Sequence, residues 1–103
     1  MHPSRVQRSP LLKLTDLPNV GPAMARDLER MGFRSPQELA HRDPWTLYTL
    51  LCEKTGVRQD PCVLDTLMSI TDYLGGHAPQ PWWAYTGERR RRYGRLLGAV
   101  SKA

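Results

Sequence analysis

The residue pattern best suited to chemistry lies in the segment LTDLPNVGPAMARDLERMG, residues 14–32. Pro18 cannot continue a helix, because its ring blocks the preceding turn and it has no amide hydrogen. Asn19 and Gly21 are residue types that tolerate positive φ, which a tight reversal needs. Pro22 suits the first position of a following helix. The pattern predicts helix, turn and helix, with unpaired amides at the second helix that can bind an anion.

The predicted anion site is built from main-chain groups, so its residues are identified by backbone position. Lys13 and Arg26 are its neighbouring cations. The backbone positions are Pro18, Asn19, Val20, Gly21, Pro22 and Ala23.

Side chains that commonly carry catalysis are scattered. His2, His41 and His77 fall in a chain end, a helix end and a Gly-rich loop, without a carboxylate at productive spacing. Cys52 and Cys62 form no C-x-x-C pair and have no regular His spacing, so they do not indicate a zinc site. We interpret both as buried small hydrophobes. We therefore expect no enzyme activity, no catalytic residue and no metal site.

The net charge of +5 is concentrated at the C-terminal end of the 103-residue chain. Residues 1–80 carry nine basic and nine acidic side chains, whereas residues 81–103 carry six basic side chains and one acid. Adjacent arginines can contact phosphates in any conformation, although a solvated helix that aids solubility is the alternative. The candidate phosphate contacts in this segment are Arg89, Arg90, Arg91, Arg92 and Arg95.

Trp82, Trp83 and Tyr85 form an aromatic group just before the arginines. One interpretation is a stacking platform for bases. The other is a lid that closes a core otherwise short of aromatic residues. We favour the lid, because two adjacent tryptophans bury a large apolar area.

Capping residues followed by proline predict the helix starts. Ser9-Pro10, Ser35-Pro36, Asp43-Pro44 and Asp60-Pro61 each place a side-chain acceptor before a proline, and Pro22 adds a fifth start. Glu38, three residues after Ser35, completes a capping box. Apolar stripes follow each start and no segment alternates with period two, so the chain is predicted to be all-α.

We expect a flexible N-terminus at 1–8, a helical domain at 9–86 and a basic C-terminal tail at 87–103. No run of 18 apolar residues indicates a membrane span, and the first residues lack an apolar signal core, so a cytoplasmic protein is expected.

The sequence Leu17-Pro18-Asn19-Val20-Gly21 closely resembles the hairpin of helix-hairpin-helix DNA-binding domains. The resemblance implies that hairpin amides hold the DNA backbone without reading sequence, with a monovalent cation held by hairpin carbonyls in many members. Two departures stand out: Asn19 replaces the usual Gly, and Pro22-Ala23-Met24 stands where many DNA-binding hairpins have Lys or Arg. The alternative is a motif that only joins two packed helices, as in structural or protein-binding copies.

Residues 55–60 are interpreted as a degenerate second hairpin, which gives a five-helix double helix-hairpin-helix domain. The chain from about Leu11 to Glu88 also resembles a bacterial group described as pathogenicity-locus or mitomycin-resistance-related proteins. That likeness rests on Asp43-Pro44, on residues 60–65 (DPCVLD) and on Pro81-Trp82-Trp83. It implies a bacterial cytoplasmic setting and the fold. The expected function is DNA binding without sequence preference, with a protein-interaction module as the alternative.

Overall fold

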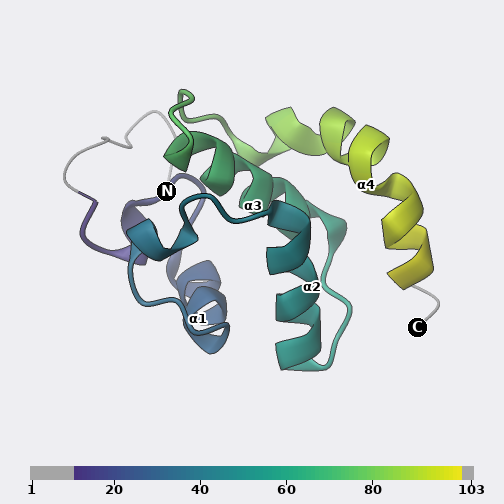
Figure 1. Cartoon of the computed structure of the whole chain (residues 1–103), viewed down its shortest axis with the longest axis horizontal. Helices are drawn as coiled ribbons and strands as arrows, with labels where there is room; N and C mark the ends of the chain where they lie inside the picture. The colour runs from purple at the N-terminus through teal and green to yellow at the C-terminus, as the bar shows by residue number, and fades with distance from the viewer. Residues whose placement is uncertain (1–10, 101–103) are drawn as a thin grey trace.

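Helix α3 is the central element of the fold, because apolar side chains cover most of its circumference. Its residues Leu64, Leu67, Met68 and Ile70 are all buried. The computed structural model describes residues 11–100 (Figure 1). Its elements, where η marks a 3-10 turn, are η2 (Leu14–Asp16), α1 (Pro22–Arg30), η3 (Pro36–Leu39), α2 (Pro44–Thr55), α3 (Pro61–Leu74), η4 (Trp82–Tyr85) and α4 (Thr86–Val100).

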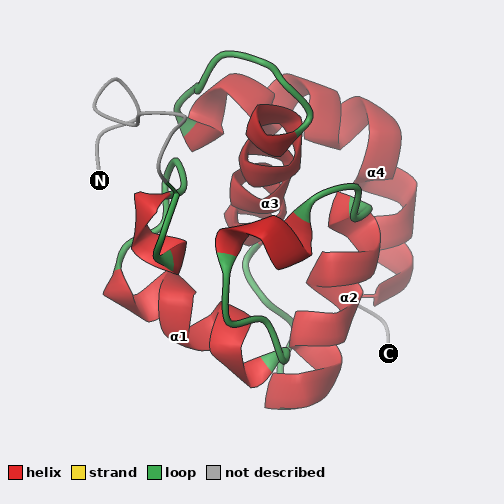
Figure 2. Ribbon diagram, turned by 60° about the vertical axis from the view of Figure 1, so that its left-hand side comes forward, coloured by secondary structure: helices red, strands yellow, loops and turns green. Residues whose placement is uncertain are grey.

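The other elements surround α3. Helices α2 and α4 and the turns η3 and η4 pack against it, and α1 packs against α2 and η2. Both ribbon views place α1 and α4 on opposite sides of α3 (Figures 1 and 2). Within residues 11–100 no segment forms a strand, which agrees with the all-α prediction.

Three of the predicted helix starts are found where a capping residue precedes proline. Asp43 Oδ2 accepts a hydrogen bond from the Thr46 amide at 2.9 Å, and Asp60 Oδ1 accepts one from the Cys62 amide at 2.9 Å. At the third start, Glu38 Oε2 accepts from the Ser35 amide at 2.8 Å. Each carboxylate satisfies a donor that the first helical turn leaves free. The start predicted at Ser9-Pro10 lies outside the described residues.

Two of the five predicted helices are shorter than expected. In the described part of the first, only the 3-10 turn η2 forms, because Asp16 accepts hydrogen bonds from the amides of Leu12 and Lys13 and Lys13 is extended. The segment after Pro36 also makes only a 3-10 turn, which is followed by His41 at a φ of 62°.

The predicted basic tail is helical as far as it is described. Residues Thr86–Val100 form α4, and its Tyr93 and Leu97 are buried in the core. Tyr93 also stacks on Trp45 of α2 with ring centroids 5.7 Å apart. The arginines of the predicted tail therefore lie on a helix that is packed against the core.

The connection between α2 and α3 is fixed at both ends. Gly56 ends α2 with a φ of 70°, a left-handed conformation that favours glycine. The buried Tyr48 hydroxyl donates to the carbonyl of Gln59. Among the described residues, no helix has the length and apolarity needed to cross a membrane.

Candidate nucleic-acid interface

The turn from Leu17 to Pro22 is held on the core by its buried apolar side chains. Leu17, Pro18 and Val20 are buried, and Val20 donates its amide to the Leu17 carbonyl at 3.4 Å. The chain reverses at Asn19, whose φ is 64°. Asparagine tolerates this left-handed conformation better than most other non-glycine residues do, so the chain can reverse here without a glycine.

The Asn19 side chain adds a second function that glycine lacks. Its Nδ2 donates to Ser69 Oγ on α3 at 2.9 Å and to the Gln80 carbonyl at 2.8 Å. Asn19 thus joins the turn to the central helix and to the loop before η4. The sequence shows only the conformational preference, because both partners lie at least 50 residues away along the chain.

Several amides at this turn have no acceptor. Within residues 11–100, no carbonyl or side chain accepts from the amides of Asn19, Gly21, Ala23 or Met24. Pro18 and Pro22 have no amide hydrogen, and the amide of Val20 is bonded to Leu17. Met24 was not singled out from the sequence, although the third residue after an N-cap is expected to keep a free amide.

Gly21 differs from the sequence-based expectation. Its φ is −93° and its ψ is −174°, so it does not adopt the positive φ that the turn was predicted to need there. This is extended backbone that any residue can adopt. No described atom lies within 4 Å of the position that a Cβ would take. Glycine at this position leaves an open space beside the free amides.

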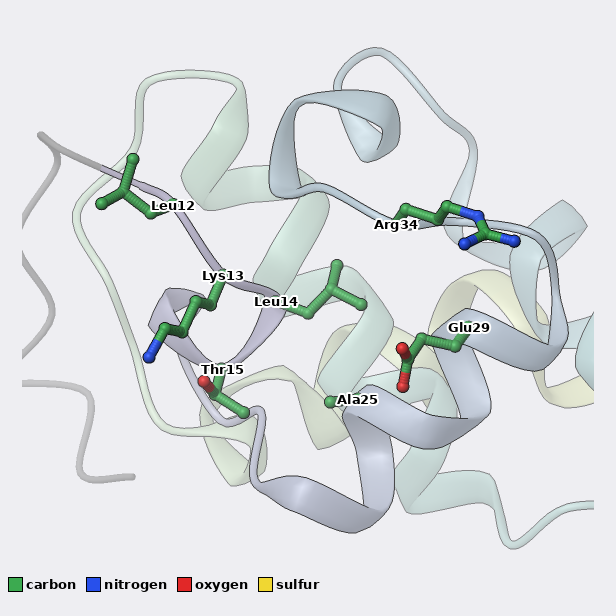
Figure 3. A pocket seen from close by; sticks show the side chains of 7 residues that line it. All are labelled: Leu12, Lys13, Leu14, Thr15, Ala25, Glu29 and Arg34. Carbon is green, nitrogen blue, oxygen red and sulfur yellow. The ribbon is translucent and has the colours of Figure 1, made fainter.

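Lys13 and Arg26 lie on the elements that flank the turn. Lys13 lines a groove of about 270 Å³ between η2, α1 and the following loop (Figure 3). Arg34 and Glu29 line the same groove, with the Lys13 ammonium and the Arg34 guanidinium at its opposite ends in Figure 3. Arg26 is exposed on α1, and within residues 11–100 it forms no ion pair. Arg34 was missed because it lies outside the turn motif.

The burial of the aromatic residues Trp82, Trp83 and Tyr85 differs from the prediction. Trp82 and Trp83 are exposed, with 36% and 60% of their surface accessible, so they do not form the expected lid. Tyr85 is the buried member, and its hydroxyl donates to Asp72 Oδ2 at 2.9 Å. Burial and the bond to Asp72 raise the pKa of Tyr85 well above its usual value. One tyrosine anchored to α3 fills the place expected for the tryptophans.

The arginines also divide into two groups. Arg89 Nε donates to Asp65 Oδ1 at 2.8 Å, and the Asp65 side chain is fully buried. Arg92 pairs with Glu88 at 2.9 Å and covers the Tyr93 ring. The three remaining arginines are exposed and form no ion pair in the described part of the chain; they are Arg90, Arg91 and Arg95.

The sequence does contain a signal for the inward position of Arg89, namely a carboxylate within the apolar stripe of α3. Asp65 interrupts an apolar stripe between Leu64 and Leu67, and a carboxylate on a buried helix face needs a charged or hydrogen-bonding partner. Thr86 Oγ1 supplies the second bond, to Asp65 Oδ2 at 2.7 Å.

The cysteines do not indicate an active thiol. Cys52 and Cys62 are free and half-buried. Cys62 donates from Sγ to Asp60 Oδ1 at 2.7 Å, and this bond, with burial, raises the pKa of the Cys62 thiol. The thiolate is the nucleophilic form, so the shift lowers reactivity at neutral pH. Among the described residues, no three His, Cys, Asp or Glu side chains group as metal ligands.

Comparison with known proteins agrees with the resemblance noted for residues 11–88. The family model described as "Pathogenicity locus" matches residues 7–91. The mitomycin resistance protein McrB of Streptomyces lavendulae is 47% identical over 78 residues, which are 76% of this chain and 74% of that protein. No solved structure matches the chain. The match of this family model over residues 7–91, together with the 47% identity to McrB, shows that the protein belongs to the pathogenicity-locus family.

Proposed function

We propose that this protein binds DNA through the phosphate backbone, without reading base sequence, in the cytoplasm of its cell. The bound phosphate would accept hydrogen bonds from the amides of Gly21, Ala23 and Met24 at the start of α1. The single observation that carries the proposal is this group of amides without acceptors on a turn whose underside is buried. The partial positive charge of a helix N-terminus adds to their attraction for an anion.

We interpret the turn and its flanking elements as the first hairpin of a double helix-hairpin-helix unit. In this interpretation α2, residues 56–60 and α3 form the second, degenerate hairpin, and η3 bridges the two. The second hairpin is the weaker phosphate site, because the Asp60 carboxylate already accepts from the first free amide of α3. The phosphate is therefore expected at the first hairpin.

Helix α4 would supply long-range electrostatic attraction for the DNA phosphates. Its exposed Arg90, Arg91 and Arg95 add positive charge to α4, which lies on the far side of α3 from α1 (Figure 1). Such charges add affinity that falls with salt, since bound phosphates release counterions. They carry no sequence preference.

Gly21→Ala tests the proposal directly. The backbone at residue 21 accepts alanine without strain, so the variant is expected to fold with unchanged or slightly higher stability. Its methyl group would occupy the open space beside the amides and limit how closely a phosphate approaches. We expect weaker binding to a short duplex, measured by fluorescence anisotropy, and smaller shifts of the residue 19–24 amides in ¹⁵N NMR titrations.

Gly94→Ala is the matched control, because it adds the same methyl group in open space on α4. It is expected to bind the duplex like the parent protein. Equal affinities of Gly21→Ala and the parent, or NMR shifts confined to residues 89–95, would contradict phosphate binding at the turn.

The second candidate is a protein-interaction module in which the turn only joins packed helices. The full burial of Leu17 and Val20 favours it, because such a turn serves packing even without a ligand. Absence of binding to DNA and to RNA at low salt would support this function and contradict the first.

A further inference from the structure

We infer that Trp82 and Trp83 form a stacking platform for an unpaired base, so that the protein binds single-stranded nucleic acid more tightly than continuous duplex. The inference rests on the proposed phosphate binding and adds the form of nucleic acid that the site selects.

The two tryptophans present apolar surface outward. They are 36% and 60% exposed, and their rings meet edge to face with centroids 5.6 Å apart and planes at 85°. Within residues 11–100, neither indole N–H has a hydrogen-bond acceptor. An exposed aromatic face with a free donor at its edge can stack on a base and also hydrogen-bond to it.

The backbone that carries the platform is held at both ends. It forms the first two residues of η4, where Ala84 donates its amide to the Pro81 carbonyl at 3.0 Å. The other end of η4 is held by the buried Tyr85 and its hydrogen bond to Asp72 on α3. Because this backbone is already ordered, a base that stacks on the tryptophans does not pay the entropy cost of ordering it.

The platform lies beside the turn that carries the free amides. Asn19 of the turn donates to the Gln80 carbonyl at 2.8 Å, and Trp82 follows Gln80 by two residues. Two residues of extended chain span about 7 Å at most. One strand can therefore place a phosphate at the turn and a neighbouring base on the platform.

Positive charge flanks the platform on its other side. Arg91 Nη1 lies 3.5 Å from the position that a Cβ of Gly87 would take, so its guanidinium folds back along α4 toward η4. Glu88, the only acidic residue of the sequence from 81 to 103, is paired with Arg92. The Arg91 side chain is thus available for a second phosphate of the same strand.

This arrangement favours unpaired bases for a steric reason. In continuous duplex the faces of the bases are covered by their neighbours in the stack, and only phosphates and groove edges are accessible. A single strand offers its base faces at no cost of unstacking a duplex. Since every base has such a face, the preference is for strand form and carries no sequence specificity.

Trp83→Ala, with the full-length chain, tests the inference. Leu96→Ala is the matched control, because Leu96 is also an exposed apolar side chain, on α4, and belongs to neither of the two turns proposed to hold phosphate. The probes are a short oligothymidylate, the same strand without bases, and a duplex of equal length. Affinities are measured by fluorescence anisotropy at several salt concentrations.

The parent protein is expected to bind oligothymidylate about 5- to 150-fold more tightly than the strand without bases. Trp83→Ala should bind oligothymidylate and the strand without bases with similar affinity. The slope of log K against log [salt] should stay unchanged, because stacking releases no counterion. Arg91→Ala should instead make that slope less negative by about 0.7 on single strands, because one phosphate contact is lost. Leu96→Ala should behave like the parent.

The results separate the two proposals. If Trp83→Ala binds all probes like the parent while Gly21→Ala still weakens duplex binding, the platform is wrong and phosphate binding at the turn stands. If the parent binds the duplex more tightly than oligothymidylate, the inferred preference is wrong. If the parent binds none of the probes, the proposed function itself fails, and the exposed tryptophans are better explained as a contact for a protein partner.

Discussion

Asp65 and Asn19 join surface elements to the central helix, and each does so with polar atoms in partly or fully buried positions. Asp65 holds α4 through Arg89 and Thr86, and Asn19 holds the turn through Ser69 and Gln80. Buried polar groups cost free energy unless they are hydrogen-bonded, so each bond also fixes the geometry of its partner. Arg89 therefore positions α4, and its charge is used inside the molecule.

Asp65→Ala should destabilise the protein by about 3–5 kcal/mol, because it leaves the largely buried Arg89 without its partner. The free energy of unfolding in urea measures the effect. Glu88→Ala is the matched control on α4, where it breaks an exposed ion pair to Arg92 and should cost no more than about 1 kcal/mol. Equal losses for the two variants would show that the Asp65 pair is not a buried one in solution.

At the scale of elements, the starts of the helices follow local sequence rules and their lengths follow packing. The capping carboxylates of Glu38, Asp43 and Asp60 all accept main-chain hydrogen bonds where the sequence places them. Such caps depend only on residues within one turn. The 3-10 turns η2 and η3 are each followed by non-helical backbone, extended at Leu17 and left-handed at His41.

The Glu38 cap should make stability depend on acid. Hydrogen bonds from the amides of Arg34 and Ser35 hold the pKa of Glu38 below its usual 4.5. The stabilisation is therefore present above pH 4.5 and is lost as pH falls through the lower pKa of the folded protein. Glu38→Ala should unfold at a lower urea concentration at neutral pH and lose less stability between about pH 5 and pH 3 than the parent does.

Glu53→Ala is the control for Glu38→Ala. Glu53 is exposed on α2 and has no hydrogen-bond or ion-pair partner in the described part of the chain. It should keep the acid dependence of the parent. A Glu38→Ala profile parallel to that of the parent would contradict the role of the cap.

Across the whole molecule, the polar and aromatic surfaces are arranged around α3. The turn before α1 and the platform of η4 meet through Asn19 and Gln80, whereas helix α4 lies on the other side of α3 from α1 (Figure 1). The core beneath them contains several tyrosines, among them Tyr48, Tyr85 and Tyr93. Their hydroxyls are surrounded by protein, so ionising them is unfavourable in the folded state.

The buried tyrosines should make the protein unstable in alkali. Burial raises the pKa of Tyr48 to about 12, and it also raises the pKa values of Tyr85 and Tyr93 above 10.0. The unfolded chain loses these protons first, so the free energy of unfolding should decrease as pH rises from about 10 to about 12. Urea unfolding at a series of pH values measures the slope. A flat profile over this range would contradict the burial of the hydroxyls, and Tyr48→Phe should reduce the slope.

Much of the candidate site follows from local sequence. Pro18 and Pro22 delimit the turn, Asn19 adopts the expected positive φ, and free amides occur where a helix must leave them. Gly21 shows the limit of such reasoning, because its residue type permits positive φ but the neighbouring chain does not require it. Conformational tolerance of a residue does not determine the conformation that packing selects.

The aromatic and basic residues show a different limit. Trp83 and Arg89 have the residue types predicted to close the core and to contact phosphate, yet the structure places the tryptophan outside and the arginine inside. Tyr85, two residues after Trp83, fills the core position expected for the tryptophan. Asp65, 24 residues before Arg89, holds that arginine inside the molecule. A side chain's own chemistry does not reveal which neighbour competes for the same space.

The sequence by itself determined the all-helical class, the helix starts and the turn, because capping, proline geometry and apolar periodicity act within one or two turns of chain. Only the tertiary structure decided which conformation Gly21 adopts, which tryptophans face solvent and which arginine is buried. Those outcomes depend on contacts between segments such as Asn19 with Gln80 and Asp65 with Arg89, and packing chooses among many such pairs only when the whole chain is folded.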